Sequence, residues 1–420
     1  MTISQCRFIR CLPASLLLGL ILSSGHAADA PAPQTLRIGA LLSLTGNWSS
    51  LGLMSQTVLE LAQHDVNRYL SSHGSNKRVE VLVRDTQLDP ELALQQLRRL
   101  IHRQNVIAVI GPQSSSEVSR LKDLADRERV PLLSQGSTAS SLSLAGDSVY
   151  RLVPDDSHES EAMAALMQQR GVQVVIPAWR ADAGNDGLQQ SLQARLTAAH
   201  AEMLPGVRYS TDREDFGDVA QQLKKQLDQA LRTHQASAVA IYLAGFDEVA
   251  ALFHAAEAHP VLRRVKWYGS DGVALSGALQ ADDVAAAFAM AVDYPNPTLG
   301  LPDAAQAKWQ ALSDRVFAQT GQRPDAFALA AYDALWLVAL NAGYQADIQQ
   351  HTSKDILAQT AAEHFGATGW TVFNRAGDRQ RGDYDFWALR RAADGSAQWV
   401  SVCRYDTSSS AEGALRCTED

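Results

Sequence analysis

The sequence predicts an α/β fold in which parallel strands are covered by helices on both faces. Short β-branched or aliphatic runs alternate along the chain with amphipathic stretches whose apolar residues recur every three to four positions. This rhythm is typical of βαβ units. The chain has 420 residues, which is long for one core and sufficient for two domains of ordinary size. Because no linker interrupts the composition, we expect two closely connected lobes.

Each element is assigned from its local pattern, in chain order. Strands are predicted where apolar runs are short, at 35–44, 79–85, 106–111, 131–135, 172–179, 238–245 and 265–271. Helices are predicted where apolar residues recur with helical spacing, at 54–70, 90–103, 116–128, 215–232, 305–321 and 325–343. From 370 to 400 a turn signal at Asn374–Asp378 precedes alternating residues, which favours a hairpin.

The N-terminus has the pattern of a secretory signal. Arg7 and Arg10 precede the apolar run 13–24, and Gly25-His26-Ala27 supplies small residues for cleavage. The run is roughly half of the ~20 residues that a membrane-spanning helix needs. We therefore predict a signal peptide at 1–27, cleaved near Ala27, and a soluble protein exported to the periplasm.

Composition and charge restrict the partners. Hydrophobic residues make up 46% and charged residues 20% of the chain, as in ordinary globular proteins. The formal net charge is −9, and loss of Arg7 and Arg10 with the signal peptide makes the mature protein more acidic still. An acidic surface argues against nucleic acid or an anionic membrane as a partner.

Two cysteines remain after the signal is removed. Cys6 and Cys11 lie within the signal, whereas Cys403 and Cys417 lie near the C-terminus. In an oxidising compartment, we expect these two to form a disulfide that closes a short loop. The alternative is a metal pair, but the sequence has neither a CxxC motif nor clustered histidines. No metal is predicted.

Hydroxyl-bearing residues follow two neighbouring strands. Ser114–Ser116 come after the strand at 106–111, and the residues Gly136, Ser137 and Thr138 come after the strand at 131–135. Ligands of parallel sheets bind beyond the carboxyl ends of the strands, where helix N-termini also present free N–H groups. Each loop alone is explained as well by helix capping, with Ser116 as the cap. Two such loops together favour a site for a carboxylate.

Catalytic and cofactor motifs are missing from the sequence. No G-x-S-x-G or H-E-x-x-H pattern occurs, and none of the serines 114–116 begins an S-x-x-K pattern. The segment 45–52 lacks the lysine of a phosphate-binding loop. His158–Ser160 is interpreted as a solvated helix start rather than a metal site. We predict neither an enzyme nor a cofactor.

Several segments in this order resemble one protein family. They are IGALLSLTGNWSSLG (38–52), the acidic stretch around DPELALQQLRRLI (89–101), IGPQSSSEV (110–118), VPLLSQGSTASSLS (130–143) and YGSDGV (268–273). The chain resembles the type I periplasmic solute-binding proteins, and within them the branched-chain amino acid (Leu/Ile/Val) binding proteins of ABC transporters. The resemblance covers about residues 36–400.

The resemblance implies two doubly wound, Rossmann-like lobes joined by three crossing segments. The first lobe would contain 36–152 and 294–372, and the second 153–293 and 373–420. The crossings would lie near Arg151–Pro154, Asp293–Pro295 and Tyr384–Trp387. A ligand would bind between the lobes, which would close on it by a hinge.

The resemblance also implies roles for individual residues. Ser115, Gly136 and Thr138, with Ser137 between them, match positions that hold a ligand carboxylate. Asp271 matches the acidic residue that binds the α-ammonium group from the second lobe, and Phe246 matches an aromatic that covers the ligand. Alternatives remain for these residues: Thr138 and Asp271 are also common turn residues, and Phe246 is also a core residue.

The chain departs from the family pattern in two places. An aromatic residue expected in the second lobe is missing from the segment 183–188, so Asp182, Asn185 or Asp186 is expected to line the cleft instead. In the first loop Leu51 replaces the tyrosine that is common in the branched-chain binders, and Trp48 lies nearby. These changes leave the identity of the ligand open.

Three functions follow from these observations. The leading hypothesis is a monomeric periplasmic binding protein that captures an amino acid or analogue and delivers it to an inner-membrane ABC permease. A sensor component with the same fold is the second. A secreted hydrolase that uses Ser115 is the third, and the missing motifs disfavour it.

Overall fold

The first half of the chain forms a five-stranded parallel sheet. In this computed structural model the described residues are 34–344, 354–407 and 413–418, so the predicted signal peptide at 1–27 lies outside them. The sheet has the order β2-β1-β3-β4-β5, with every neighbouring pair parallel. Its strands are β1 (Gln34–Leu42), β2 (Lys77–Asp85), β3 (Ala108–Ile110), β4 (Leu132–Ser134) and β5 (Val149–Arg151).

Helices cover both faces of this sheet. Alternate residues of β1 point to opposite faces, so Ile38 packs in one core and Leu41 in the other. One face is covered by α1 (Ser49–Ser72), α11 (Ala326–Tyr344) and α12 (Lys354–Glu363). The other is covered by α2 (Pro90–Gln104) and α3 (Ser115–Glu128).

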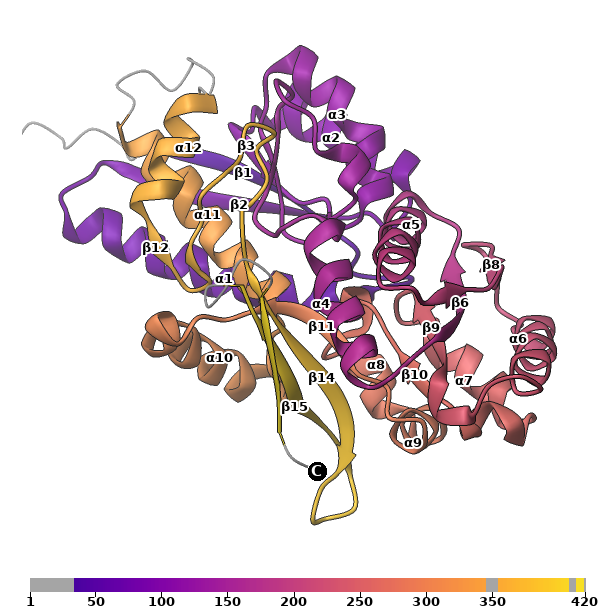
Figure 1. The fold of residues 1–420 in the computed structure, drawn as a ribbon. Coiled ribbons are helices and arrows are strands. Elements are labelled where there is room, and N and C mark those ends of the chain that lie inside the picture. The colour runs from indigo at the N-terminus through magenta and orange to yellow at the C-terminus, as the bar shows by residue number, and fades with distance from the viewer. Residues whose placement is uncertain (1–33, 345–353, 408–412, 419–420) are drawn as a thin grey trace, which may run out of the picture.

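A second parallel sheet occupies the middle of the chain. Its order is β10-β9-β6-β7, and β8 also pairs with β6. The strands are β6 (Val174–Arg180), β7 (Glu202–Met203), β8 (Val207–Tyr209), β9 (Val239–Ala244) and β10 (Lys266–Tyr268). One face is covered by α4 (Asp156–Gln169) and α5 (Ala183–Ala198). The other is covered by α6 (Gly217–Ala230), α7 (Val249–Glu257) and α9 (Asp283–Ala291), while the short α8 is Gly277–Ala281. Figure 1 shows the two sheets with their helices as separate bodies.

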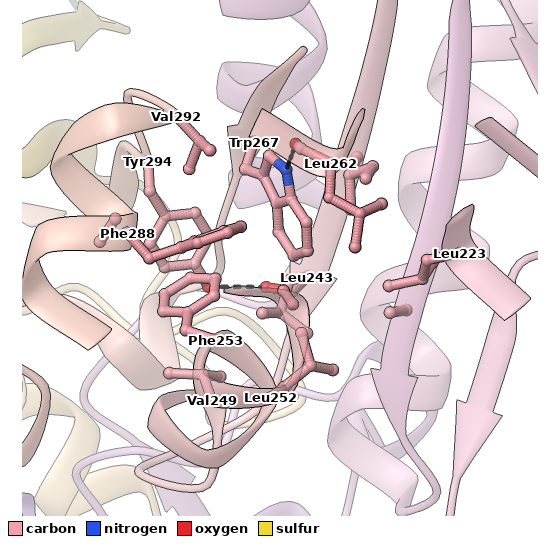
Figure 2. Packing of buried hydrophobic residues seen from close by; sticks show 14 of the residues in the cluster. Leu223, Leu243, Val249, Leu252, Phe253, Leu262, Trp267, Phe288, Val292 and Tyr294 are labelled. Carbon is pink, nitrogen blue, oxygen red and sulfur yellow. Dashed lines mark hydrogen bonds between the residues drawn. The ribbon is translucent and has the colours of Figure 1, made fainter. Parts of the chain in front are cut away.

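Aromatic residues fill the core between this second sheet and the helices α7 and α9 (Figure 2). Trp267 on β10 is fully buried, and its ring lies edge-on to Phe253 and Phe288. The Trp267 indole N–H donates to the Leu262 carbonyl at 2.9 Å, and the Tyr294 hydroxyl donates to the Leu243 carbonyl at 3.0 Å. The polar atoms of both large side chains are therefore satisfied where they are buried.

An antiparallel sheet connects the two bodies. Its order is β11-β14-β15-β16, with β11 at Asn296–Gly300, β14 at Asp383–Arg391, β15 at Ala397–Asp406 and β16 at Ala414–Cys417. The hairpin predicted in this region is present as β14 and β15, which run down the middle of Figure 1. The remaining elements of the first body are α10 (Gln306–Thr320) and the small pair β12 (Phe365–Gly366) and β13 (Gly369–Trp370).

The segment before β14 returns to the edge of the first sheet. Gly377 and Arg379 exchange backbone hydrogen bonds with Arg151 at the end of β5. The Arg151 guanidinium, fully buried, binds both carboxylate oxygens of Asp378 at 2.5 and 2.7 Å and the Ala139 carbonyl at 2.7 Å. This bidentate pair joins the end of β5 to the segment that precedes β14.

Cys403 and Cys417 form the predicted disulfide. They face each other across β15 and β16, so the bond joins the last strand to its neighbour. Cys403 is buried in the core that lies between the second parallel sheet and α4 and α5, whereas Cys417 is exposed. The bond therefore fastens the end of the described chain to the second body.

We expect exported protein to contain this bond quantitatively. Reduction should raise the intact mass by two hydrogens, and the Cys403→Ser/Cys417→Ser variant should lose about 3 kcal/mol of unfolding free energy, because the unfolded chain is no longer cross-linked. Mass spectrometry and urea unfolding measure the two effects. Two thiols that alkylate freely in native, unreduced protein would contradict the expectation.

Candidate functional site

The carboxyl ends of the two parallel sheets face each other, and the loops beyond them touch. The loop after β1 meets the loop after β9: the Asn47 amide donates to Glu248 at 2.7 Å, and the Ser50 hydroxyl donates to Asp247 at 2.8 Å. The loop after β3 meets the start of α5, where the Ala183 N–H donates to the Ser116 hydroxyl at 3.2 Å. The two bodies are thus closed on each other.

Two predicted aromatic residues form part of this closed contact. Trp48 and Phe246 come from opposite bodies and stack with ring centroids 4.1 Å apart and planes 16° apart. Both are buried, and the Arg180 guanidinium lies 5.5 Å from the Phe246 ring. Next to them only about 10 Å³ remains between Leu51 and Ala274, room for about one water molecule.

The three serines after β3 have three different environments. Ser114 is the N-cap of α3 and forms a capping box with Glu117, so the expected capping role belongs to Ser114 and not to Ser116. Ser115 accepts from the Ala139 N–H at 3.1 Å and shares a 3.0 Å hydrogen bond with the Ser137 hydroxyl. Ser116 reaches the other body. Capping therefore accounts for one serine out of three.

The loop after β4 is built around the same contacts. The Ser137 N–H donates to the Ser134 hydroxyl at 3.0 Å, which fixes the turn. A Cβ on Gly136 would lie 3.0 Å from the Gln113 carbonyl and 3.2 Å from the Trp48 ring, so the position is crowded. The Thr138 carbonyl accepts from the Asp156 N–H at 2.8 Å. This hydrogen bond ties the loop to the first turn of α4.

Three carboxylates gather beyond β5 and β10, and we call them the carboxylate cluster: Asp156, Glu159 and Asp271. Asp156 and Glu159 lie three residues apart on the first turns of α4 and are 0% and 2% exposed. Asp271 follows β10 and is partly exposed, and its N–H donates to Glu159 at 3.3 Å. The predicted ammonium-binding residue therefore lies beside two acids that the sequence analysis did not include.

Burial and mutual repulsion shift the titration of this cluster. Burial, followed by the charge of Asp271, raises the pKa of Asp156 to about 8. Burial raises the pKa of Asp271 to about 6, and that of Glu159 well above its usual range. Burial and the charge of Asp271 raise the pKa of Glu159 most, and the interaction between the two carboxyl groups raises it further while it lowers the pKa of Asp271.

The polar residues that were expected to line the cleft near the segment 183–188 form hydrogen bonds and ion pairs within the second body. Asp182 caps α5 and pairs with Arg180 at 2.8 Å. The buried Asn185 amide donates to both Asp182 oxygens at 3.1 Å. Asp186 pairs with Arg208 at 2.7 Å and accepts from the Trp179 indole at 2.8 Å. The Asn185 side chain therefore holds the carboxylate of Asp182, the N-cap residue of α5.

The expectation of a solvated helix start at His158–Ser160 is wrong for two of its three residues. His158 is partly exposed and lies 3.4 Å from Asp155, but Glu159 and Ser160 are buried. The helix turns Glu159 toward the second sheet because Ala162, Met163 and Leu166 pack in the core on the same face. The sequence contains a signal for this burial: Asp156 and Glu159 are three residues apart, so on a helix they share a face with the apolar residues that follow.

Comparison with known proteins now adds to this geometry. A family model described as the receptor family ligand binding region matches residues 54–392. The chain belongs to this family. The receptor-family assignment and the parallel α/β architecture confirm the predicted family resemblance and fold class.

Relatives of this receptor-family chain extend over most of its length. An uncharacterized protein of Methanocaldococcus jannaschii is 25% identical over 372 residues, covering 84% of this chain and 87% of the relative. LivJ, a branched-chain amino acid transporter substrate-binding protein from Streptococcus pneumoniae solved with isoleucine, superposes with a TM-score of 0.71 at 20% identity, covering 88% of this chain and all of LivJ. A solute-binding protein from R. palustris solved with benzoate gives 0.70 at 17% identity, covering 92% and 98%. These structures show the shared fold.

The family is that of receptor ligand-binding regions, and the fold is shared with solved substrate-binding proteins. Among the described residues, no helix is both long and apolar enough to span a membrane. The signal peptide, the lobe boundaries and the roles of the site residues stay predictions.

The raised pKa values predict how stability depends on pH. The folded protein keeps a proton on Asp156 that the unfolded chain, with a pKa of 3.8, has already released. Stability from this group is complete below the unfolded pKa and is lost as the pH rises toward the folded value, by up to about 1.4 kcal/mol per pH unit.

Asp156→Asn removes this titration and keeps the shape of the side chain. The variant should therefore gain stability relative to the parent between about pH 5 and pH 8, as measured by urea unfolding without ligand. An equal pH dependence in both proteins would show that Asp156 titrates normally.

Proposed function

We propose that this protein is a periplasmic solute-binding protein that captures a small amino-acid-like ligand between its two lobes and delivers it to an inner-membrane ABC permease. The observation that carries the proposal is the meeting of two sheet ends. Hydroxyl groups and backbone N–H groups lie at one end, and the carboxylate cluster lies at the other. A zwitterion offers the complementary charges in this order.

The carboxylate of the ligand is assigned to the first lobe. Ser115, Ser137 and Thr138 supply hydroxyls, and the N-terminus of α3 contributes a favourable dipole. In the described chain the Ser115 hydroxyl is bonded to the Ser137 hydroxyl and to the Ala139 N–H, and the Thr138 hydroxyl lies beside the Asp156 and Asp271 carboxylates. A ligand carboxylate would replace such internal bonds with charge-assisted ones.

The ammonium group is assigned to Asp271 in the second lobe. Its carboxylate is partly exposed and lies beside the Thr138 hydroxyl, which lowers its pKa. Residues on opposite lobes contact one ligand only when the lobes are closed, so ligand would stabilise the closed form by its higher affinity for it. Trp48 and Phe246 are placed to exclude water from the closed site.

A hydrolase is disfavoured by the surroundings of Ser115. Its hydrogen bonds within the described chain go to the Ser137 hydroxyl and the Ala139 N–H, and neither is a general base. A sensor with the same fold would use the same site, so the genes next to this one separate the two: permease and ATPase genes favour transport, and a kinase or cyclase gene favours sensing.

Single substitutions test the grip on the ligand. A thermal-shift screen of amino acids and their amides supplies the ligand, and calorimetry follows. Asp271→Ala should weaken binding by roughly 2–5 kcal/mol, because the desolvated ammonium loses its partner. Ser115→Ala should cost less, roughly 1–3 kcal/mol, because backbone donors remain.

Thr211→Ala, on the exposed loop after β8, is the control and should bind like the parent. If Asp271→Ala binds as tightly as the parent, the ligand is not held by its α-ammonium group.

A further inference from the structure

The carboxylate cluster carries more negative charge than one ammonium group would balance. Both carboxylate oxygens of Asp156 are buried and have no hydrogen-bond partner of ordinary geometry, and the same holds for one oxygen of Glu159. The Thr138 hydroxyl is near enough to lower the pKa of Asp156, but it does not satisfy these oxygens. Buried ionised oxygens without partners are costly, so their retention indicates an absent partner.

The described part of the protein supplies no ion-pair partner for the cluster. Within the described part of the chain, none of the three carboxylates forms an ion pair with a lysine, arginine or histidine. The neighbouring cations are already used: Arg151 binds Asp378, Arg180 binds Asp182, and His158 lies against Asp155.

The other charged neighbours of the cluster add negative charge. Asp155 raises the pKa of Asp156, Asp182 raises that of Asp271, and Asp271 in turn raises that of Asp325. Two buried tyrosines, Tyr242 and Tyr384, also face the three carboxylates. Arg151 is near enough to lower the pKa of Asp156, but the acidic neighbours named here act in the opposite direction.

We propose that the ligand carries two positive charges, of which one is held by Asp271 and the second by Asp156 with Glu159. This inference rests on the proposed function and specifies the ligand class of the same site. If Glu159 and Asp271 share one proton, the cluster holds two negative charges once Asp156 ionises, and a dication balances both. Basic amino acids and small diamines have this chemistry in common.

The two sources differ at the opposite end of the site. A basic amino acid also offers a carboxylate to Ser115 and Ser137, whereas a diamine offers none. Substituting Ser115 should therefore weaken the binding of lysine and leave the binding of putrescine nearly unchanged.

The experiment compares matched ligands on protein freed of co-purified ligand by unfolding and refolding. The dications are L-lysine, L-ornithine, L-arginine, putrescine and cadaverine, and the comparison ligands are L-leucine, L-isoleucine and benzoate. We expect at least one dication to bind ten-fold or more tightly than every comparison ligand, and its affinity to rise between about pH 6 and pH 8 as the cluster releases protons.

Two isosteric variants and one control test whether Asp156 and Glu159 hold the second positive charge of the ligand. Asp156→Asn and Glu159→Gln should each weaken the bound dication ten-fold or more. Glu161→Gln is the matched control: Glu161 lies on the same helix and is partly exposed, but its side chain contacts Arg195 and Tyr405 and not the cluster. It should bind like the parent. Circular dichroism checks that all three variants fold.

Each other outcome is decisive. Leucine or isoleucine binding as tightly as the best dication, with Asp156→Asn and Glu159→Gln unaffected, overturns the second charge and leaves amino-acid capture intact. Binding of benzoate alone, or of none of the amines, overturns the proposed function together with this inference.

Discussion

The carboxylate cluster is the constraint on which the proposed binding site depends. Two buried acids and the partly exposed Asp271 lie where two sheet ends meet, and the chain pairs none of them with a cation in its described part. All three lie on the second body, so their mutual repulsion is present in any arrangement of the two bodies and is relieved by protons or by a bound cation. The raised pKa values of Asp156 and Asp271 show that these groups hold protons more readily than ordinary carboxyl groups. A cationic ligand would relieve the same repulsion and would link binding directly to lobe closure.

The rest of the fold places few constraints on how the two bodies move relative to each other. Each body has its own cores on both sheet faces, so neither depends on the other for most of its apolar burial. Contacts between the bodies are mainly polar and local, such as Ser50 with Asp247 and Ala183 with Ser116. The Trp48–Phe246 stack is the main apolar contribution near the site. Contacts of this kind can be remade with small changes in free energy, as hinge closure requires.

Much of the fold could be predicted from periodicity, and much of the site could not. Long elements such as α1 and β1 have clear patterns, whereas the three-residue β5 is too short to show one. The start of α4 was expected to be solvated, because acids such as Asp156 and Glu159 are seldom fully buried. Ser115, Thr138 and Asp271 were expected from family resemblance, but nothing local in the sequence reveals that Asn185 is bound by Asp182. The Cys403–Cys417 bond was predictable because only two cysteines follow the signal.

Small-angle scattering of the parent protein and Asp271→Ala, each with and without the ligand that the screen identifies, tests the central claim most directly. The account predicts that saturating ligand reduces the radius of gyration of the parent, because the ligand bridges Asp271 and the serine loops of the opposite lobe. The variant should show no such change at the same concentration. A parent profile that stays the same while calorimetry shows the site to be filled would contradict capture by lobe closure.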